Sequence, residues 1–189
     1  MASPALARPF KLDPITGEED LRDLTHPRHA LSQFYRAFNT RDIAMMQDNW
    51  SEADDISMDN PLGGITRGWP EIRRAYESIF SSNSRLIVEF HNYSIHTLGD
   101  MFYAVGRERG RYESSSFAFD LHARTTRIFR FEREHWRQVH HHGSIDDSSV
   151  LQRYQSAVNL QLAEKARSLR PLRFTFPGCS LSKTSSPAR

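Results

Sequence analysis

Three consecutive histidines, His140, His141 and His142, are the side chains of this sequence that most directly suggest chemistry. An imidazole can ligate a metal ion or transfer a proton near neutral pH. The surrounding residues predict a β-strand, in which neighbouring side chains point to opposite faces, so only His140 and His142 can share a face. No H-x-x-x-H or paired Cys/His pattern supplies further zinc ligands. We therefore expect no metal and no cofactor, with His141 facing a cavity beside Val139, and with His140 and His142 on the outer face beside Trp136.

Two arginines suggest a different chemistry, the binding of an anion. Arg127 falls on the apolar face of a predicted strand, where a lone guanidinium is costly unless it is paired. In the preceding predicted strand, Arg107 shares a face with Met101, Tyr103 and Val105. Two arginines that converge on a pocket would favour a carboxylate, which a guanidinium can hold bidentately. The alternative is that Arg127 pairs with an internal carboxylate such as Glu108 or Asp59.

The composition indicates one folded domain with tails. The chain has 189 residues, of which 38% are hydrophobic and 25% are charged, with a net charge of +2. The clustered basic charge of a nucleic-acid-binding protein is missing. Cys179 is the only cysteine, which excludes an internal disulfide and a cysteine metal cage. No apolar signal segment or membrane-spanning stretch occurs in the sequence. We expect a cytoplasmic protein without a nucleic-acid or membrane partner.

Periodic apolar residues predict three helices in the first half of the chain. The first helix, over residues 27–39, starts near Thr25 and Pro27 and carries one apolar face formed by Leu31, Phe34, Tyr35 and Phe38. Residues 39–42 break this helix, and Asp42 can cap a second helix whose apolar side includes Ile43, Met46 and Trp50. A third helix opens at Trp69 and carries the clearest apolar stripe, formed by Ile72, Ala75, Tyr76, Ile79 and Phe80.

Strand-forming residues predict an antiparallel sheet in the second half of the chain. Two short strands precede the third helix, the first at residues 54–60 and the second, together with its turn, within residues 63–68. Four longer strands follow it, at residues 85–97, 101–113, 117–133 and 136–145. Asp146 or Asp147 caps a last helix at about 148–168. We therefore divide the chain into an N-terminal arm (1–25), a domain (26–147), a C-terminal helix (148–169) and a flexible tail (170–189).

Three stretches resemble one known superfamily. Residues 34–42 (FYRAFNTRD) are similar to its first helix and following break, and residues 60–69 (NPLGGITRGW) to the turn before its third helix. Residues 136–144 (WRQVHHHGS) resemble its last strand. This is the SnoaL-like or nuclear transport factor two-like superfamily, which includes ketosteroid isomerase-like proteins. The last strand also resembles the association domain of calcium/calmodulin-dependent kinases.

The resemblance implies an α+β, cone-shaped barrel of the cystatin-like type. Three N-terminal helices would pack on a curved antiparallel sheet, followed by a C-terminal helix. It also implies a deep pocket between the helices and the sheet, and a homodimer formed through the outer sheet face. Arg107 and Arg127 match two pocket arginines of the kinase association domain, while Gly143 replaces a third. The positions that carry the chemistry of steroid isomerases hold Phe34, Asn60 and Arg127, so ketosteroid isomerisation is not expected.

We interpret the chain as a SnoaL-like protein that binds a small organic molecule, with a carboxylate as one option. The predicted pocket residues are Arg107, Arg127, His141, Asn60, Tyr35, Trp50 and Trp69. An enzyme of this kind would be a metal-independent isomerase, cyclase or dehydratase working by proton transfer. An acid–base pair of His141 with Asp59 or Tyr35 is one hypothesis for such a reaction. The alternative is a non-enzymatic dimerisation or assembly module, in which the outer sheet face carries the function.

Overall fold

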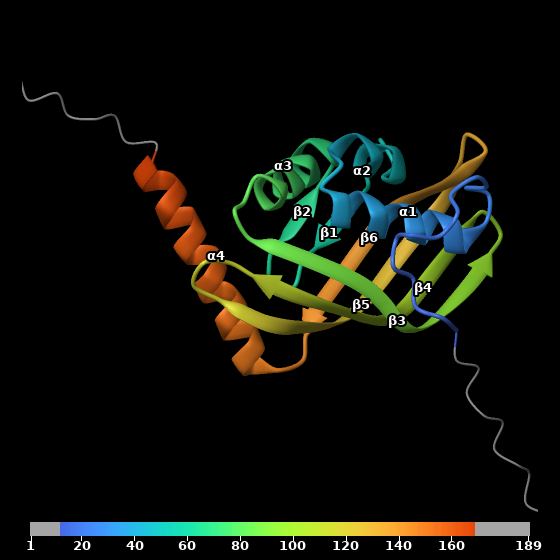
Figure 1. Cartoon of the computed structure of the whole chain (residues 1–189). Coiled ribbons are helices and arrows are strands. Elements are labelled where there is room, and N and C mark those ends of the chain that lie inside the picture. Colours follow the sequence, from blue (N-terminus) through green and yellow to red (C-terminus); the bar gives the residue numbers. More distant parts are fainter. Residues whose placement is uncertain (1–11, 169–189) are drawn as a thin grey trace, which may run out of the picture.

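The computed structural model describes residues 12–168, in which a curved six-stranded sheet is covered on one side by helices (Figure 1). The strand order across the sheet is β2-β1-β6-β5-β4-β3. The strands are β1 (Ser57–Asp59), β2 (Ile65–Arg67), β3 (Arg85–Leu98), β4 (Met101–Glu113), β5 (Ala118–Glu132) and β6 (His135–Ile145). The predicted cone-shaped α+β fold is confirmed. The predicted tail at 170–189 and the first eleven residues of the predicted arm lie outside the described residues.

Three helices, α1 (Pro27–Thr40), α2 (Ile43–Asn49) and α3 (Trp69–Phe80), lie together over the concave face of the sheet (Figure 1). The cap of α1 is His26 rather than Thr25, because His26 accepts a hydrogen bond from the backbone N–H of Arg28 at 3.3 Å. Arg41 ends α1 in the left-handed conformation. Asp42 caps α2 as predicted, accepting from the backbone N–H of Met45 at 2.9 Å.

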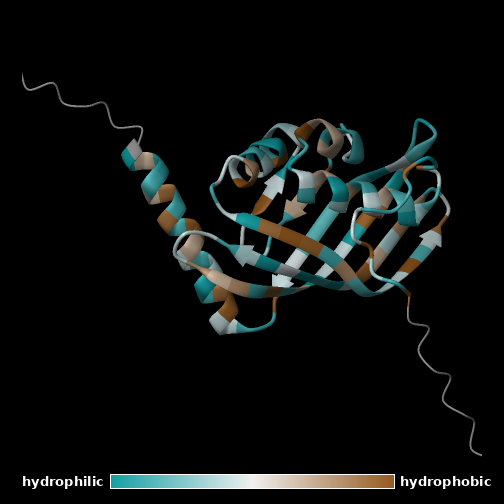
Figure 2. Ribbon diagram, viewed as in Figure 1, coloured by the Kyte–Doolittle hydropathy of each residue, from teal (hydrophilic) through white to brown (hydrophobic). Residues whose placement is uncertain are grey.

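The four long strands form an antiparallel meander, while β1 joins β6 in parallel. Apolar and polar residues alternate along these strands (Figure 2), because one face is covered by helices and the other is open. On β5 the predicted alternation is confirmed, since every second residue from Phe119 to Phe129 is buried. The parallel pairing places Met58 beside His141 and so ties the helical half of the chain to the last strand.

A bulge in β6 changes which side chains face the helices. Ile128 of β5 pairs with His140 and Phe129 pairs with Gln138, so Val139 is an extra residue in β6. Alternation shifts by one residue at this point, and Trp136 faces the interior together with His141. The prediction that Trp136 lies on the outer face is therefore wrong: its ring packs against that of Phe102 at 4.9 Å.

The interior divides into two hydrophobic clusters. The inner core lies under α1–α3 and includes Leu31, Phe34, Tyr35, Trp50, Tyr76, Phe90, Phe102 and Phe129. The end core lies under α4 (Ser148–Ser168) and consists of Tyr112, Phe119, Leu121, Ala123, Ile145, Tyr154 and Ala157. Figure 1 shows α4 at one end of the sheet, from which it runs away from the other helices. Helices α1–α3 therefore cover one part of the concave face, and α4 covers another part.

The described part of the N-terminal arm packs against the domain. Ile15 is fully buried and exchanges two backbone hydrogen bonds with Phe90 on the edge strand β3, at 2.8 and 3.0 Å. Arg36 of α1 donates to the backbone carbonyl of Gly17 at 2.6 Å. These contacts cover part of a sheet edge that would otherwise be open. Within residues 12–168, no helix combines the length and the apolar character needed to cross a membrane.

Candidate ligand site in the cone interior

Arg127 is the centre of a polar network inside the inner core. Its side chain projects from the middle of β5 towards the helices and is 1% exposed. The guanidinium donates to Glu108 Oε1 at 2.7 Å, to Gln138 Oε1 at 2.8 Å and to the Tyr35 hydroxyl at 3.2 Å. The Tyr35 hydroxyl donates in turn to the same Glu108 oxygen at 2.9 Å. The buried guanidinium therefore has a carboxylate partner on the neighbouring strand.

The charge of Arg127 is compensated within the protein. Burial opposes this charge, but Tyr35 and Glu108 outweigh the effect and hold the pKa of Arg127 above its ordinary value. The guanidinium carbon also lies 3.4 Å from the centre of the Phe34 ring, an arrangement in which the π-electrons stabilise a cation. Of the two possibilities that the sequence leaves open for Arg127, the structure has the internal ion pair. Its charge is therefore not free to attract an anion.

His141 lies beside this network with neither ring nitrogen hydrogen-bonded to the described residues. The side chain is 7% exposed, and its ring centre lies 6.3 Å from that of Phe34. Burial, reinforced by the charge of Arg127, keeps the pKa of His141 well below its usual range. The imidazole is therefore neutral at pH 7 and offers one donor and one acceptor. A buried polar group without a partner destabilises a protein by about 1–3 kcal/mol. A ligand that hydrogen-bonds to this imidazole would recover part of that free energy.

Three further buried atoms around Phe34 and Arg127 lack a partner of good hydrogen-bond geometry among the described residues. They are Gln138 Nε2, Trp50 Nε1 and the Tyr76 hydroxyl. The rings of Trp50 and Tyr76 lie 6.5 Å apart, and that of Tyr76 lies 6.3 Å from Phe34. Burial raises the pKa of Tyr76, so its hydroxyl keeps its proton. The group as a whole is neutral: the imidazole and the Tyr76 hydroxyl can each donate and accept, whereas Gln138 Nε2 and Trp50 Nε1 can only donate.

The structure brings four of the predicted pocket residues together, namely Tyr35, Trp50, Arg127 and His141. Trp69 is half-buried and packs against the inner core from the start of α3. Asn60 instead shapes a turn, in which its Oδ1 accepts from the backbone N–H of Leu62 at 2.8 Å. Gln138, Glu108 and Tyr76, which belong to this buried cluster, are not among the predicted pocket residues. Tyr76 belongs to the predicted apolar stripe of α3, and Glu108 is predicted only as an alternative partner of Arg127.

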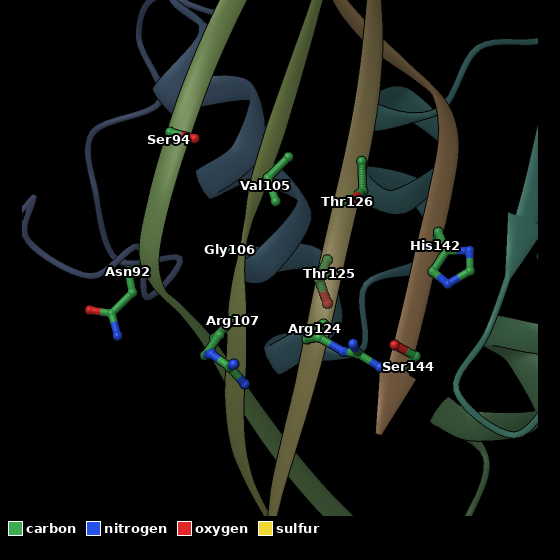
Figure 3. A pocket seen from close by; sticks show the side chains of 10 residues that line it. All are labelled: Asn92, Ser94, Val105, Gly106, Arg107, Arg124, Thr125, Thr126, His142 and Ser144. Atoms are coloured by element: carbon green, nitrogen blue, oxygen red, sulfur yellow. The ribbon is translucent and has the colours of Figure 1, made fainter. Parts of the chain in front are cut away.

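Contrary to expectation, Arg107 does not converge with Arg127. Arg107 projects from the outer face of the sheet, is half exposed, and donates to Asp146 Oδ2 at 2.8 Å. The register explains this, because Ala104 lies opposite Arg127 whereas Arg107 lies opposite Arg124, three positions away and on the other face. Arg107 and Arg124 line an open depression of ≈ 630 Å³ on the outer face. Figure 3 shows the two side chains next to each other on neighbouring strands. Asp146 pairs with both arginines.

The other histidines of the triplet also lie on the outer face. His142 Nδ1 is 3.1 Å from Asp59 Oδ2, and His140 Nδ1 is 2.8 Å from the Ser57 hydroxyl. Asp59 and His141 therefore lie on opposite faces, and the hypothetical acid–base pair of these two residues does not form. Tyr35 is bonded to Glu108 and Arg127 rather than to His141. Within residues 12–168, no group of three His, Cys, Asp or Glu side chains is placed to hold a metal ion.

A family model described as a SnoaL-like domain matches residues 28–148, the segment that contains the whole sheet and all of the inner core except the contribution of the N-terminal arm. The chain belongs to the SnoaL-like domain family. The match ends at the first residue of α4, so nearly all of this helix lies beyond the matched segment. The recognition of the SnoaL-like or nuclear transport factor two-like superfamily from the sequence is confirmed.

Solved structures agree on the fold of this SnoaL-like chain. A proposed dehydratase of the NTF2-like family from Streptomyces avermitilis superposes with a TM-score of 0.58, covering 63% of this chain and 92% of that one, at 20% identity. A proposed calcium/calmodulin-dependent protein kinase type II association domain from Thiobacillus denitrificans has a TM-score of 0.54, with coverage of 66% and 98% and 23% identity.

A curated relative extends the comparison to plants. The F-box protein SKIP8 of Arabidopsis thaliana is 22% identical over 123 residues, which make up 64% of this chain and 51% of the relative. The chain therefore spans about half the length of the curated relative that it matches. At these identities the solved structures establish the fold, and activity must be argued from this chain's own site.

Proposed function

We propose that the interior of the cone binds a small, neutral organic molecule that carries a carbonyl or hydroxyl group. The observation that carries this proposal is the buried imidazole of His141, whose two nitrogens are both unpaired among the described residues. Gln138 Nε2 and the Tyr76 hydroxyl supply further donors around the same aromatic wall. A ligand oxygen that accepts from one of these donors would remove a desolvation penalty from the free protein.

The electrostatics of the site favour a neutral ligand over the carboxylate that the sequence suggests. Glu108 already compensates Arg127 at 2.7 Å, and Arg107 lies on the other side of the sheet. A carboxylate would therefore enter a buried site with no free cation to pair with, which is costly. A ketone or an alcohol loses far less on desolvation.

A proton-transfer reaction at this site, of the isomerase, cyclase or dehydratase kind, would take Glu108 as its candidate base, because Glu108 is the carboxylate of the network. The imidazole of His141, whose pKa is lowered by burial, would be a neutral hydrogen-bond partner of the ligand. Tyr35 and Arg127 both donate to Oε1 of Glu108. The other carboxylate oxygen, Oε2, would accept a proton from a bound molecule. His141 would then orient the ligand.

The test is a binding comparison of cyclohexanone, cyclohexanol and cyclohexanecarboxylate by ¹H–¹⁵N NMR titration. We expect the ketone and the alcohol to bind, with the carboxylate at least about tenfold weaker, a difference of about 1.4 kcal/mol. His141→Leu should abolish binding, while the matched variant His142→Leu on the outer face should retain it. Failure of all three probes to bind would overturn the proposal. So would preferential binding of the carboxylate that depends on Arg107.

A second candidate function, assembly through the outer sheet face, is supported by exposed apolar residues on β4. Met101, Tyr103 and Val105 are 37%, 43% and 44% exposed there, and His96 stacks on Tyr103 with ring centres 4.8 Å apart. Such a row on a sheet face is typical of a protein–protein contact. We expect light scattering to report a dimer that Val105→Asp dissociates. The matched variant Leu162→Asp, at an exposed leucine on α4, should leave the dimer intact, and a monomeric parent would contradict this candidate.

A further inference from the structure

A groove between α3 and α4 lies outside the site described above. It has a volume of ≈ 560 Å³, within the range of about 300–1,000 Å³ that is typical of small-molecule sites. One wall is the end of α3 with the following serines, Ser81, Ser82 and Ser84, and the other wall is α4. The floor includes Leu86 and Tyr112 from the concave face of the sheet. Helix α4, which forms one wall of this groove, lies almost wholly beyond the segment that the family model matches.

The two walls of the groove expose apolar side chains to solvent. Ile79 on α3 is 36% exposed and Leu162 on α4 is 53% exposed, and both line the groove. Val158, which also lines the groove, packs against the end core. Helix α4 buries Tyr154 and Ala157 against the sheet, but Ile79 and Leu162 stay exposed. An apolar ligand between the walls would bury these side chains. Each Å² of apolar surface removed from water would contribute about 25 cal/mol to the binding free energy.

Tyr112 adds a specific polar group to the floor of the groove. Its side chain is 2% exposed, and its hydroxyl has no hydrogen-bond partner among the described residues. The ring is fixed by Phe119 at 5.0 Å and by Tyr154 at 5.7 Å. A buried phenol that is held in place and unpaired offers one directed hydrogen bond to a molecule in the groove.

The charges around the groove indicate whether the polar group of a ligand should be neutral or ionised. Among the described residues, Glu164 and Lys165 are the charged side chains that line it, and Lys165 Nζ lies 3.4 Å from the Ser81 hydroxyl on the opposite wall. Serine hydroxyls make up most of the remaining rim. The groove therefore combines balanced charge at its rim with an uncharged polar floor, which suits an alcohol better than an ionised head group.

We propose that the groove between α3 and α4 binds a small apolar alcohol, with its chain between Ile79 and Leu162 and its hydroxyl on Tyr112. This site is separate from the cone interior, because it is built on the end core and on α4 rather than on Arg127 and His141. Either site can exist without the other.

The probe is 1-octanol, added to the full chain and followed by ¹H–¹⁵N NMR. We expect shifts at α4 and at the 81–86 segment that saturate with concentration. Tyr112→Phe removes only the hydroxyl and should weaken binding roughly fivefold, the effect of one net hydrogen bond. Val158→Trp should fill the groove and abolish binding, whereas the matched variant Asn159→Trp, at the exposed neighbouring position, should leave the affinity unchanged.

Three results would overturn the proposal. The first is the lack of saturable binding by the parent chain. The second is an affinity that is equal in the parent, Tyr112→Phe and Val158→Trp. The third is a dimer of the parent that Leu162→Asp dissociates, since a second copy would then occupy the groove. His141→Leu should leave octanol binding intact, so failure of the interior site and failure of the groove give different results.

Discussion

The two clusters on the concave face of the sheet, the inner core and the end core, differ in the polar groups that they bury. The inner core encloses an ion pair, Arg127 with Glu108, together with the neutral imidazole of His141. The end core is made of apolar and aromatic side chains, and Tyr112 carries its unpaired hydroxyl. Both clusters lie on the same strands, so the difference arises from the side chains that these strands present along their length. At the inner core β4, β5 and β6 present Glu108, Arg127 and His141, whereas at the end core they present apolar and aromatic residues.

This contrast suggests what each cluster contributes. A buried ion pair adds little net stability compared with apolar packing, because desolvation offsets the attraction between the charges. The inner core therefore retains polar groups at a site where they contribute little to folding, which is expected for a functional site. The end core attaches α4 to the sheet by aromatic packing of Tyr112, Phe119 and Tyr154. The three predictions that follow test this division.

The largest effect is expected from breaking the ion pair. Glu108→Ala leaves the guanidinium of Arg127 buried without its carboxylate and should lower the free energy of unfolding by about 3–5 kcal/mol. Urea unfolding followed by circular dichroism measures this change. Replacing both partners, with Glu108→Leu and Arg127→Met, should restore stability to within about 1 kcal/mol of the parent.

The matched change in the end core is Tyr112→Phe, which removes a hydroxyl that has no described partner. We expect it to change the free energy of unfolding by less than about 1 kcal/mol. A cost of Glu108→Ala as small as that of Tyr112→Phe would show that the two clusters do not differ in this way.

An intermediate effect is expected from acid, acting on the inner core. In the unfolded chain His141 has an ordinary pKa of about 6.5, whereas burial lowers its pKa in the folded protein. The contribution of the neutral imidazole is thus fully present above about pH 6.5 and is lost as the pH falls, at up to about 1.4 kcal/mol per pH unit. Between pH 7 and 5 the parent should lose about 2 kcal/mol more than His141→Leu.

The end core provides the control for this pH dependence. Burial raises the pKa of Tyr154 to about 12, so this group does not titrate between pH 5 and 7. Tyr154→Phe should therefore show the same pH profile of stability as the parent, in urea unfolding at pH 7, 6 and 5. Parallel profiles for the parent and His141→Leu would contradict the assignment of a buried neutral imidazole.

The smallest effect is expected at the start of α4. Asp147 Oδ1 accepts from the backbone N–H of Ser149 at 2.8 Å, and Asp147→Ala should destabilise α4 by about 1 kcal/mol. Hydrogen exchange should show this as lower protection of α4 amides, with the inner core unchanged. Asp146→Ala is the matched control, because Asp146 pairs with exposed arginines of the sheet rather than with α4. Equal loss of protection in the two variants would contradict the role of Asp147 as the cap.

Local patterns in the sequence were sufficient to predict the helices, the strands and their caps. The predicted helix at 27–39 is α1 (Pro27–Thr40), the strand at 101–113 is β4, and Asp42 and Asp147 act as caps. The prediction of Arg127 on an apolar face also needed only the alternation within one strand. These features depend on residues a few positions apart, which is why periodicity predicts them.

The pairing and register of the strands could not be predicted from such local patterns. The bulge at Val139 turns Trp136 inward, and nothing in the residues of β6 alone indicates the extra position. Likewise, the alternation in β4 shows that Tyr103, Val105 and Arg107 share a face but not which face. That choice depends on the pairing of Ala104 with Arg127. A shift of one residue in a register exchanges the two faces of a strand.

The sequence by itself determined the helices, the strands, the SnoaL-like family and the presence of a buried arginine, because these follow from local periodicity and from motifs. Only the tertiary structure decided that Arg127 is neutralised by Glu108 and that Arg107 lies on the outer face. It also showed that α4 creates a groove with α3. These properties arise from contacts between segments distant in the chain, where register and the docking of helices determine which side chains meet.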